Sequence, residues 1–172
     1  MTLAGNRVLM FVDDGYEDLE FWYPRLRLTE EGAVVDVAAA ERKTYHGKYG
    51  YPAHADLTYV DADTSAYDAL VIPGGYAPDR IRRSRTALAV VRELVRAHKV
   101  IGAICHGPHV LISAGVLRGV RATGFASIAD DIINAGAEYV DAEVVCDGGL
   151  ITSRTPDDLP AFCRALIRAL EG

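Results

Sequence analysis

A cysteine stands where a predicted buried strand turns into a helix. Residues 99–104 (KVIGAI) form an apolar run, and Cys105 and the sequence HGP follow it directly. Unpaired backbone N–H groups and the dipole at a helix N-terminus favour negative charge, which lowers the pKa of a thiol placed there. Gly102 and Gly107 leave space for a tight turn on either side. We therefore predict a nucleophilic thiolate at Cys105.

The ends of two other predicted strands carry groups that complement a thiolate. Glu17 follows the first strand, and Gly74 and Gly75 follow the run ALVI. Doubly wound sheets bind ligands beyond the carboxyl ends of their strands, and we expect the first strand to lie beside the strand that leads to Cys105. A carboxyl in an apolar site can stay protonated and donate a hydrogen bond to a thiolate, or move substrate protons, which is the role predicted for Glu17. The two glycines could place backbone N–H groups beside that of His106 as an oxyanion hole.

The role of His106 is open on sequence grounds. Side chains at adjacent helical positions diverge by about 100°, so His106 becomes a base for Cys105 only if the turn has a special geometry. Tyr16, Tyr76 and His109 lie on the same predicted rim and are candidates for substrate binding. Taken alone, the Pro-Gly-Gly sequence at Gly74 and Gly75 indicates only a turn.

Alternation of short apolar runs with helical periodicity predicts an α/β domain with a mostly parallel sheet. In the helix expected over 17–31, Leu19, Trp22, Leu26 and Leu28 recur near the helical period. The whole chain, residues 1–172, reads as one domain without a linker or repeat. The expected strands are 7–12, 33–40, 69–72, 99–104 and one near 120, and the other expected helices are 86–98, 106–114, 127–135 and 155–170.

Two segments are predicted as hairpins. Residues 41–58 are rich in Gly, Tyr and His without clear periodicity, and residues 144–151 turn through Asp-Gly-Gly. Thr155 followed by Pro156 and two acids is a strong start for the last helix, with Thr155 as its N-cap. Packing is the better explanation for Cys146 and Cys163, which lie in apolar surroundings.

Composition excludes several classes of function. The formal charge is -6, and the sequence contains no run of five Lys or Arg, so a nucleic-acid partner is not expected. We see no signal peptide and no apolar run near the roughly 18 residues that span a bilayer, so no membrane partner is expected. Three widely spaced cysteines predict neither disulfides nor a zinc site, and they suit a reducing cytoplasm. We expect no metal and no cofactor.

Several sequence blocks resemble the PfpI/ThiJ superfamily, which includes intracellular protease I and the Parkinsonism-associated DJ proteins. The blocks are YEDLEFWYP, GKYGY, LVIPGGYAPDRIR, AICHGPHVLISAGVLRG and INAGAEYVDAEVV, and they cover essentially the whole chain in the order of the family. Class I glutamine amidotransferases also use an elbow cysteine, but they need a late His-x-Glu pair, and no histidine follows His109. The α/β-hydrolase motif G-x-S-x-G and the P-loop are absent.

The resemblance implies a flavodoxin-like three-layer sandwich with a nucleophile elbow at Cys105. It also implies that Glu17 contacts the thiol and that N–H groups at Gly75 and His106 face the substrate. In PfpI-like members, a carboxylate from a neighbouring subunit orients the histidine, and Asp79 occupies the position where that residue is usually Glu. A homodimer or homohexamer with Asp79 reaching across the interface is therefore expected.

The chain departs from the usual pattern of the family at the rim of the predicted site. Tyr76 stands where Arg is common, Tyr49 where His is common, and His109 where Gln is common. These departures alter the pocket rim and leave the substrate class open, while the nucleophile is unchanged.

The resemblance favours a cofactor-free enzyme that acts on small reactive aldehydes, of the glyoxalase III or deglycase type. In that hypothesis Cys105 attacks the aldehyde of a compound such as methylglyoxal, and Glu17 moves a proton between adjacent carbons. Alternatives are a PfpI-type cysteine peptidase or amidohydrolase built on Cys105, His106 and Asp79, and a redox sensor or chaperone that uses oxidation of Cys105. A specialised lyase or hydratase served by Tyr76 and His109 is a further possibility.

Overall fold

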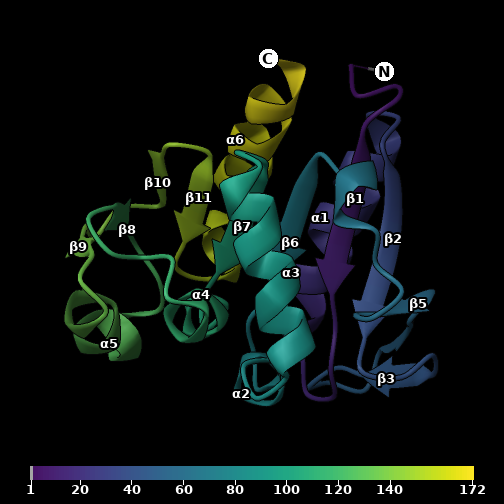
Figure 1. Cartoon of the computed structure of the whole chain (residues 1–172), viewed down its shortest axis with the longest axis horizontal. Coiled ribbons are helices and arrows are strands. Elements are labelled where there is room, and N and C mark those ends of the chain that lie inside the picture. Colours follow the sequence, from purple (N-terminus) through teal and green to yellow (C-terminus); the bar gives the residue numbers. More distant parts are fainter. Residues whose placement is uncertain (1) are drawn as a thin grey trace.

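A seven-stranded, mostly parallel sheet forms the centre of the computed structural model, which describes residues 2–172 (Figure 1). The strand order is β10-β11-β7-β6-β1-β2-β5, and β10 pairs antiparallel with β11 while all the other pairs are parallel. The strands are β1 (Arg7–Phe11), β2 (Val34–Ala39), β5 (Leu57–Thr58), β6 (Ala69–Ile72), β7 (Val100–Ile104), β10 (Val144–Asp147) and β11 (Leu150–Ser153). Every residue of β6 is buried, as expected of a central strand with both faces covered.

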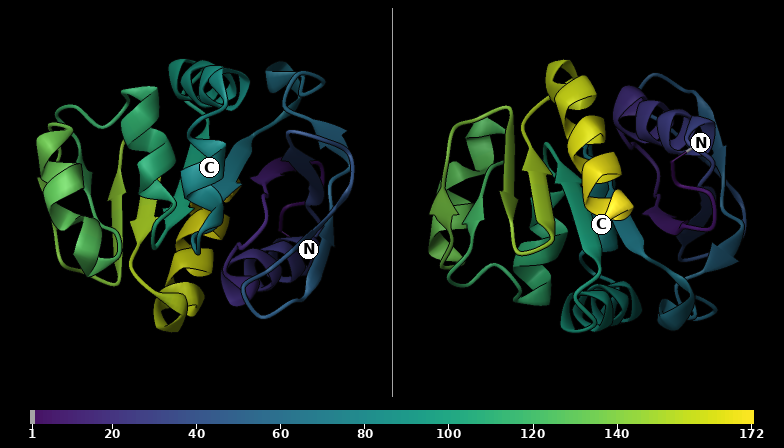
Figure 2. Two further views of the ribbon diagram at one scale, coloured as in Figure 1. Left: turned by 90° about the horizontal axis from the view of Figure 1, so that it is seen from below. Right: turned by 90° about the horizontal axis from the view of Figure 1, so that it is seen from above.

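Helices cover both faces of the sheet. Figure 2 shows α1 and α6 together on one face, with α3 and α4 on the other. The helices are α1 (Asp18–Glu30), α2 (Ala77–Ile81), α3 (Arg85–Arg96), α4 (Pro108–Ala114), α5 (Ala129–Asn134) and α6 (Leu159–Glu171). The predicted α/β three-layer sandwich is confirmed, and the short helix α2 is an element that periodicity did not reveal. None of the helices in residues 2–172 is long and apolar enough to cross a bilayer.

Two small accessory sheets lie outside the central one. Strands β3 (Thr44–His46) and β4 (Pro52–His54) pair antiparallel inside the segment predicted as a hairpin. Strands β8 (Arg121–Ala122) and β9 (Glu138–Tyr139) pair in parallel near β10. The predicted hairpin over 144–151 is also confirmed, as β10 and β11.

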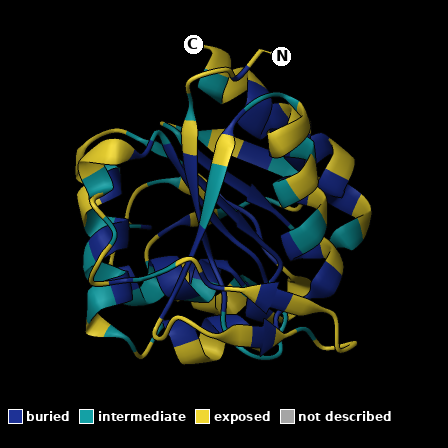
Figure 3. Cartoon of the chain, turned by 90° about the vertical axis from the view of Figure 1, so that its right-hand side faces the viewer, coloured by how far each residue is buried: buried dark blue, intermediate teal, exposed yellow. Residues whose placement is uncertain are grey.

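The buried face of α1 differs from the predicted one. Leu19 and Leu26 are 58% and 62% exposed, although the helical period suggested that both face the core. Leu28 is fully buried, as predicted, and the buried side also carries Phe21 and Glu20, of which Glu20 is a charged residue type that is fully buried. Figure 3 shows the buried strands at the centre, with exposed residues on the outer faces of the helices. The core therefore takes in a carboxyl that the pattern had placed on the solvent side.

Strand β6 lies between β1 and β7, which corrects the expectation that the first strand lies directly beside the strand leading to Cys105. The site is consequently built from three adjacent strand ends. The loop after β1 and the loop after β6 are joined by an antiparallel bridge between Tyr16 and Gly75. This bridge brings the start of α1 towards the elbow that follows β7.

The last helix begins later than predicted. A 3-10 turn over Pro156–Asp158 precedes α6, and the side chain of Thr155 makes no capping hydrogen bond. The prediction that Cys163 packs in the core is confirmed, since it is buried on α6. The same prediction for Cys146 is wrong. Strand β10 is the edge of the sheet, and Cys146 on it is exposed.

The bridge at Gly75 generates a stability prediction. Gly75 has a φ of 76°, and a side chain there would overlap the backbone of Gly15, Tyr16 and Glu17. Gly119 has the same kind of backbone, with a φ of 77°, but open space around it. We expect Gly75→Ala to lower the free energy of unfolding by about 3 kcal/mol, from backbone strain plus steric overlap, and Gly119→Ala by about 1 kcal/mol from strain alone. Urea unfolding of both variants measures the difference, and equal losses would contradict the role given to the bridge.

Candidate active site

Cys105 sits on a tight turn between β7 and α4 with a left-handed backbone, at a φ of 60°. Three backbone hydrogen bonds hold this conformation. The N–H of Cys105 donates to the carbonyl oxygen of Ser153 at 3.0 Å, its own carbonyl accepts from Phe125 at 2.9 Å, and Gly107 donates to Ile104 at 2.8 Å. A non-glycine residue with this φ is uncommon and persists where surrounding contacts fix it. The predicted nucleophile elbow is present.

Glu20, not Glu17, is the carboxyl that lies against the thiol. A β-carbon placed on Gly74 would come within 2.5 Å of Glu20 Oε2 and 2.7 Å of Cys105 Cβ, so the two side chains meet at this glycine. Glu20 Oε2 accepts the N–H of Gly74 at 2.8 Å, while Oε1 is buried without a hydrogen-bond partner in residues 2–172. Glu17 faces elsewhere and pairs with Lys48. The prediction that Glu17 contacts the thiol is therefore wrong, and the contacting residue, Glu20, lies about one helical turn further along the chain.

The protonation of this pair differs from the predicted thiolate. Burial, followed by the charge of Glu20, raises the pKa of Cys105 to about 12, and the N–H groups of Gly75 and His106 oppose this only in part. Cys105 lies three positions before the first residue of α4, a helix of seven residues. The stabilisation by the helix dipole that the sequence predicted therefore does not extend to the sulfur. Burial also raises the pKa of Glu20 to about 8. Near neutral pH both groups carry a proton.

Two backbone N–H groups point at the sulfur, those of Gly75 and His106. The N–H of Gly74 is not available, because the carboxyl of Glu20 accepts it. The predicted oxyanion hole is thus reduced to two donors, with Gly74 serving to hold the acid. Two donors converging beside a nucleophile are the arrangement that stabilises a developing oxyanion.

His106 lies within hydrogen-bond distance of the nucleophile. Its Nδ1 is 3.2 Å from the sulfur of Cys105, and its Nε2 is 3.4 Å from the hydroxyl of Ser127. The divergence of adjacent helical side chains does not apply, because both residues stand on the turn before α4. The ring stacks on Phe125, with 5.1 Å between centroids. Burial, with the nearby charges of His109 and Lys48, lowers the pKa of His106, so the imidazole is neutral and can accept a proton.

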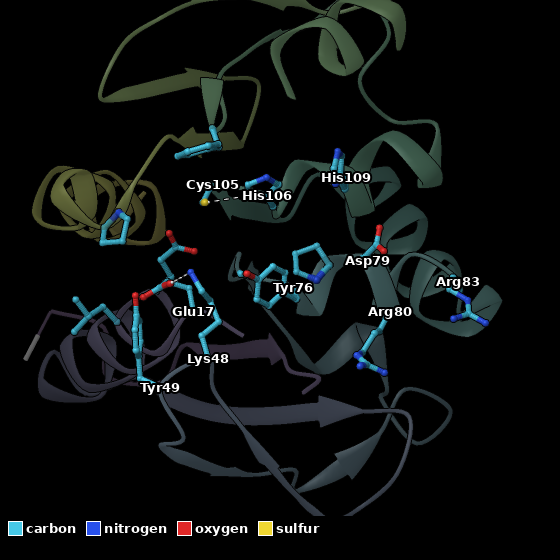
Figure 4. Close-up of a pocket in the computed structure, with 16 residues that line it drawn as sticks. Glu17, Lys48, Tyr49, Tyr76, Asp79, Arg80, Arg83, Cys105, His106 and His109 are labelled. Carbon is cyan, nitrogen blue, oxygen red and sulfur yellow. Dashed lines mark hydrogen bonds and ion pairs between the residues drawn. The ribbon is translucent and has the colours of Figure 1, made fainter. Parts of the chain in front are cut away.

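Above the thiol opens a cleft of about 870 Å³ (Figure 4). Cys105 and His106 form one side of it, and Glu17, Lys48 and Tyr49 form the opposite side. The lining residues are Glu17, Leu19, Glu20, Lys48, Tyr49, Gly75, Tyr76, Pro78, Asp79, Arg80, Arg83, Cys105, His106, His109, Phe125 and Pro156. The cleft brings together most of the residues singled out from the sequence and adds Glu20, Lys48 and Phe125.

Of the residues predicted at the rim, Tyr49, Tyr76 and His109 line this cleft and Tyr16 does not. Tyr76 is 69% exposed at the rim, and His109 lies 3.4 Å from the carboxylate of Asp131. Asp79 also lines the cleft, but no hydrogen bond joins it to His106 within the described chain. The prediction that Tyr16 binds substrate is wrong, because its side chain is fully buried.

Tyr16 instead supports the segment that forms the far wall. Its hydroxyl donates to the carbonyl of Tyr51 and accepts from the indole of Trp22, and its own carbonyl accepts the N–H of Lys48 at 2.8 Å. Lys48 Nζ in turn is 2.9 Å from Glu17 Oε2, an ion pair in which the carboxylate is nearly buried. A lone lysine in a Gly- and Tyr-rich segment gave no sequence signal for this contact. Within residues 2–172, no cluster of three or more His, Cys, Asp or Glu side chains could hold a metal ion.

An α/β sandwich with a left-handed cysteine elbow, a buried carboxyl beside the thiol and an adjacent histidine defines a class of cysteine-elbow proteins. Residues 6–169 match the family model of the DJ-1/PfpI family. The chain belongs to this family. It is 47% identical over 165 residues to "Deglycase PH1704" of Pyrococcus horikoshii, which covers 96% of this chain and 99% of that protein.

Two further comparisons agree with this assignment. The chain is 41% identical over 168 residues to "Protein/nucleic acid deglycase 2" of Escherichia coli, covering 96% of this chain and 98% of that one. A crystal structure of a two-domain protein from Anabaena variabilis, with DJ-1/ThiJ/PfpI-like and ferritin-like domains, superposes with a TM-score of 0.95 at 42% identity. That match covers 96% of this chain and 48% of the two-domain chain.

The pKa of Glu20 generates a pH prediction. The pKa of a glutamate in the unfolded chain is 4.5, whereas the pKa of Glu20 in the folded protein is about 8. Between these values the native state binds more protons, so the free energy of unfolding falls as pH rises, by up to about 1.4 kcal/mol per pH unit for one group. Glu20→Gln should remove this slope. Urea unfolding between pH 5 and pH 8 measures it, with Glu30→Gln on the exposed end of α1 as the control that leaves the slope unchanged.

Proposed function

We propose that this protein is a cofactor-free enzyme that converts small α-oxoaldehydes into hydroxy acids, in the manner of a glyoxalase III or deglycase. The observation that carries the proposal is the juxtaposition at Cys105. Its sulfur has two backbone N–H donors, a proton-bearing carboxyl and a neutral imidazole around it, and it faces an open cleft. The deglycase names of two relatives support the same class of substrate.

In the proposed reaction His106 Nδ1 takes the thiol proton as the sulfur attacks the aldehyde carbon. The N–H groups of Gly75 and His106 hold the oxygen of the resulting hemithioacetal. Glu20 gives its proton to that oxygen and, now a carboxylate, removes the proton from the former aldehyde carbon, while protonated His106 gives a proton to the neighbouring carbonyl oxygen to form an enediol. Glu20 then returns the proton to the adjacent carbon as His106 takes the proton of the hydroxyl on the sulfur-bearing carbon, which leaves a thioester. Water hydrolyses the thioester, so that aldehyde and water give a hydroxy acid and the thiol is restored. A carboxyl with a pKa near the working pH suits both halves of this proton transfer.

Glu20 replaces Glu17 in the role suggested by the sequence. Glu17 is held by Lys48 at 2.9 Å and keeps a fixed partner, whereas Glu20 has an oxygen without one. The redox-sensor alternative is not favoured, because oxidation follows thiolate character and exposure, and Cys105 is 8% exposed with a raised pKa.

The activity prediction compares the two glutamates. With methylglyoxal and no glutathione, wild-type protein should form lactate, and Cys105→Ala should reduce the rate to that of buffer. Glu20→Gln should lower kcat by about 100-fold, the lower end of general acid–base contributions, because the amide cannot move a proton. Glu17→Gln should retain most of the activity. Lactate measured over time decides the matter, and a Glu17→Gln variant as impaired as Glu20→Gln would return the acid–base role to Glu17.

Hydrolysis of a small amide or peptide bond is a second candidate function, favoured by the 3.2 Å contact between Cys105 and His106. We propose that a neighbouring copy in a homodimer or homohexamer would bring its exposed Asp79 to the histidine, whose outer nitrogen has only Ser127 as a partner among residues 2–172. In that case amide hydrolysis depends on assembly.

The assembly dependence can be measured directly. Light scattering across a dilution series gives the oligomeric state, and hydrolysis of a peptide amide at each concentration should fall as the oligomer dissociates. Asp79→Asn should lower kcat for the amide by about 100-fold and leave lactate formation unchanged. Amide hydrolysis that continues in the monomer at the same rate would rule out a contribution from a second copy.

A further inference from the structure

The wall of the cleft opposite Cys105 presents a primary amine. Lys48 is the one lysine among the lining residues, and its side chain is 29% exposed. Its Nζ is 2.9 Å from Glu17 Oε2 and lies 5.6 Å from the ring centres of both Tyr49 and Tyr76. Figure 4 shows the Lys48 side chain extending from the far wall towards Glu17. The mechanism proposed above does not use this group.

An amine in a cleft that admits aldehydes can react with them. A neutral amine adds to the carbonyl carbon, forming a C–N bond as a proton moves from nitrogen to oxygen, and loss of water from this hemiaminal gives an imine. The ammonium form has no lone pair and cannot take the first step. The protonation state of Lys48 therefore decides whether the substrate modifies the protein.

We propose that Lys48 is a latent site of modification by small carbonyl compounds and that the Glu17 carboxylate suppresses this reaction by holding the side chain as an ammonium ion. The inference rests on the proposed function in one respect, namely that the cleft admits carbonyl compounds. It assigns to Glu17 a protective role that is separate from the proton transfer given to Glu20.

The backbone at Lys48 is fixed on both sides, which keeps the base of the side chain at the cleft wall. The N–H of Lys48 donates to the backbone carbonyl of Tyr16. The N–H groups of Tyr49 and Tyr51 donate to the carboxylate of Asp18 at 3.0 Å and 3.1 Å. These bonds fasten the 48–51 segment to the start of α1. Protection must therefore come from the charge state of the amine.

The charges around Lys48 favour the ammonium form. The hydrogen bond with Glu17 is the largest effect and raises the pKa of Lys48, burial opposes it, and the two tyrosines add to the increase. Glu20 and His106 also face the amine, but both are neutral near pH 7 and cannot take the place of Glu17. Each unit by which the pKa rises lowers the fraction of free amine tenfold.

Reductive ethylation tests the proposal. Acetaldehyde forms the imine and cyanoborohydride reduces it, so each reactive lysine gains an ethyl group that peptide mass spectrometry can locate. The experiment uses Cys105→Ala protein, in which the sulfur cannot consume the aldehyde, and compares it with Cys105→Ala/Glu17→Gln. Lys43 and Lys99 lie outside the cleft lining and serve as internal references in both proteins.

We expect Lys48 to be ethylated more slowly than both references in Cys105→Ala, and at least about tenfold faster, relative to the same references, once Glu17 is Gln. The pH at which Lys48 labelling reaches half its maximum should be lower in the double variant, because the hydrogen bond from Glu17 that raises the pKa of Lys48 is weakened. Unfolding would also raise the absolute labelling rates of Lys43 and Lys99, whereas loss of protection at Lys48 leaves both of these rates unchanged, so the absolute rates of the references separate loss of protection from loss of structure. An unchanged ratio and an unchanged pH midpoint would overturn the proposal.

The outcome is separable from that of the proposed function. If wild-type protein forms no lactate but Lys48 becomes reactive only without Glu17, the protective pair stands and the enzymatic assignment fails. If lactate forms and the labelling of Lys48 does not depend on Glu17, the enzymatic assignment stands and the protective pair fails.

Discussion

The left-handed backbone of Cys105 is the constraint on which the site depends. It costs about 1–2 kcal/mol for a residue with a side chain, and bonds from Ser153, Phe125 and Gly107 maintain it. These bonds come from β11, from the loop after β8 and from the turn itself, so the conformation is fixed by segments far apart in the sequence. Because the turn is not helical, Cys105 and the neighbouring His106 present their side chains to each other, which consecutive residues of a helix would not do.

Burial then decides how charge is distributed around the sulfur. The thiol and the carboxyl of Glu20 are both withdrawn from water, which raises the pKa of each, and the charge of Glu20 raises the pKa of Cys105 further, so the pair resists carrying two negative charges. One charge can form when His106 accepts the thiol proton, while the N–H groups of Gly75 and His106 face the sulfur. A resting thiol is chemically quiet, and the nucleophile is generated only as the substrate is attacked.

The sequence carried enough information for the sheet and the elbow, but not for the acid beside the thiol. Buried parallel strands such as β6 are short apolar runs, and the residues after them are easily identified. Glu17 and Glu20 stand one turn apart at the start of the same helix, and apolar spacing suggested a core face that includes Leu19. In the structure Leu19 is exposed and Glu20 is buried, where it accepts the amide N–H of Gly74, 54 residues away, a long-range contact that no local pattern encodes.

The two glutamates show how burial can be accommodated in two ways within one cleft. A carboxylate withdrawn from water needs either an opposite charge or a proton. Glu17 has the first, through Lys48 at 2.9 Å, and Glu20 has the second, with one amide donor and an oxygen left without a partner. A group with a pKa of about 8 changes its charge within reach of working conditions. Glu20 can therefore gain and lose a proton during a reaction, and the ion pair of Glu17 and Lys48 lines the same cleft.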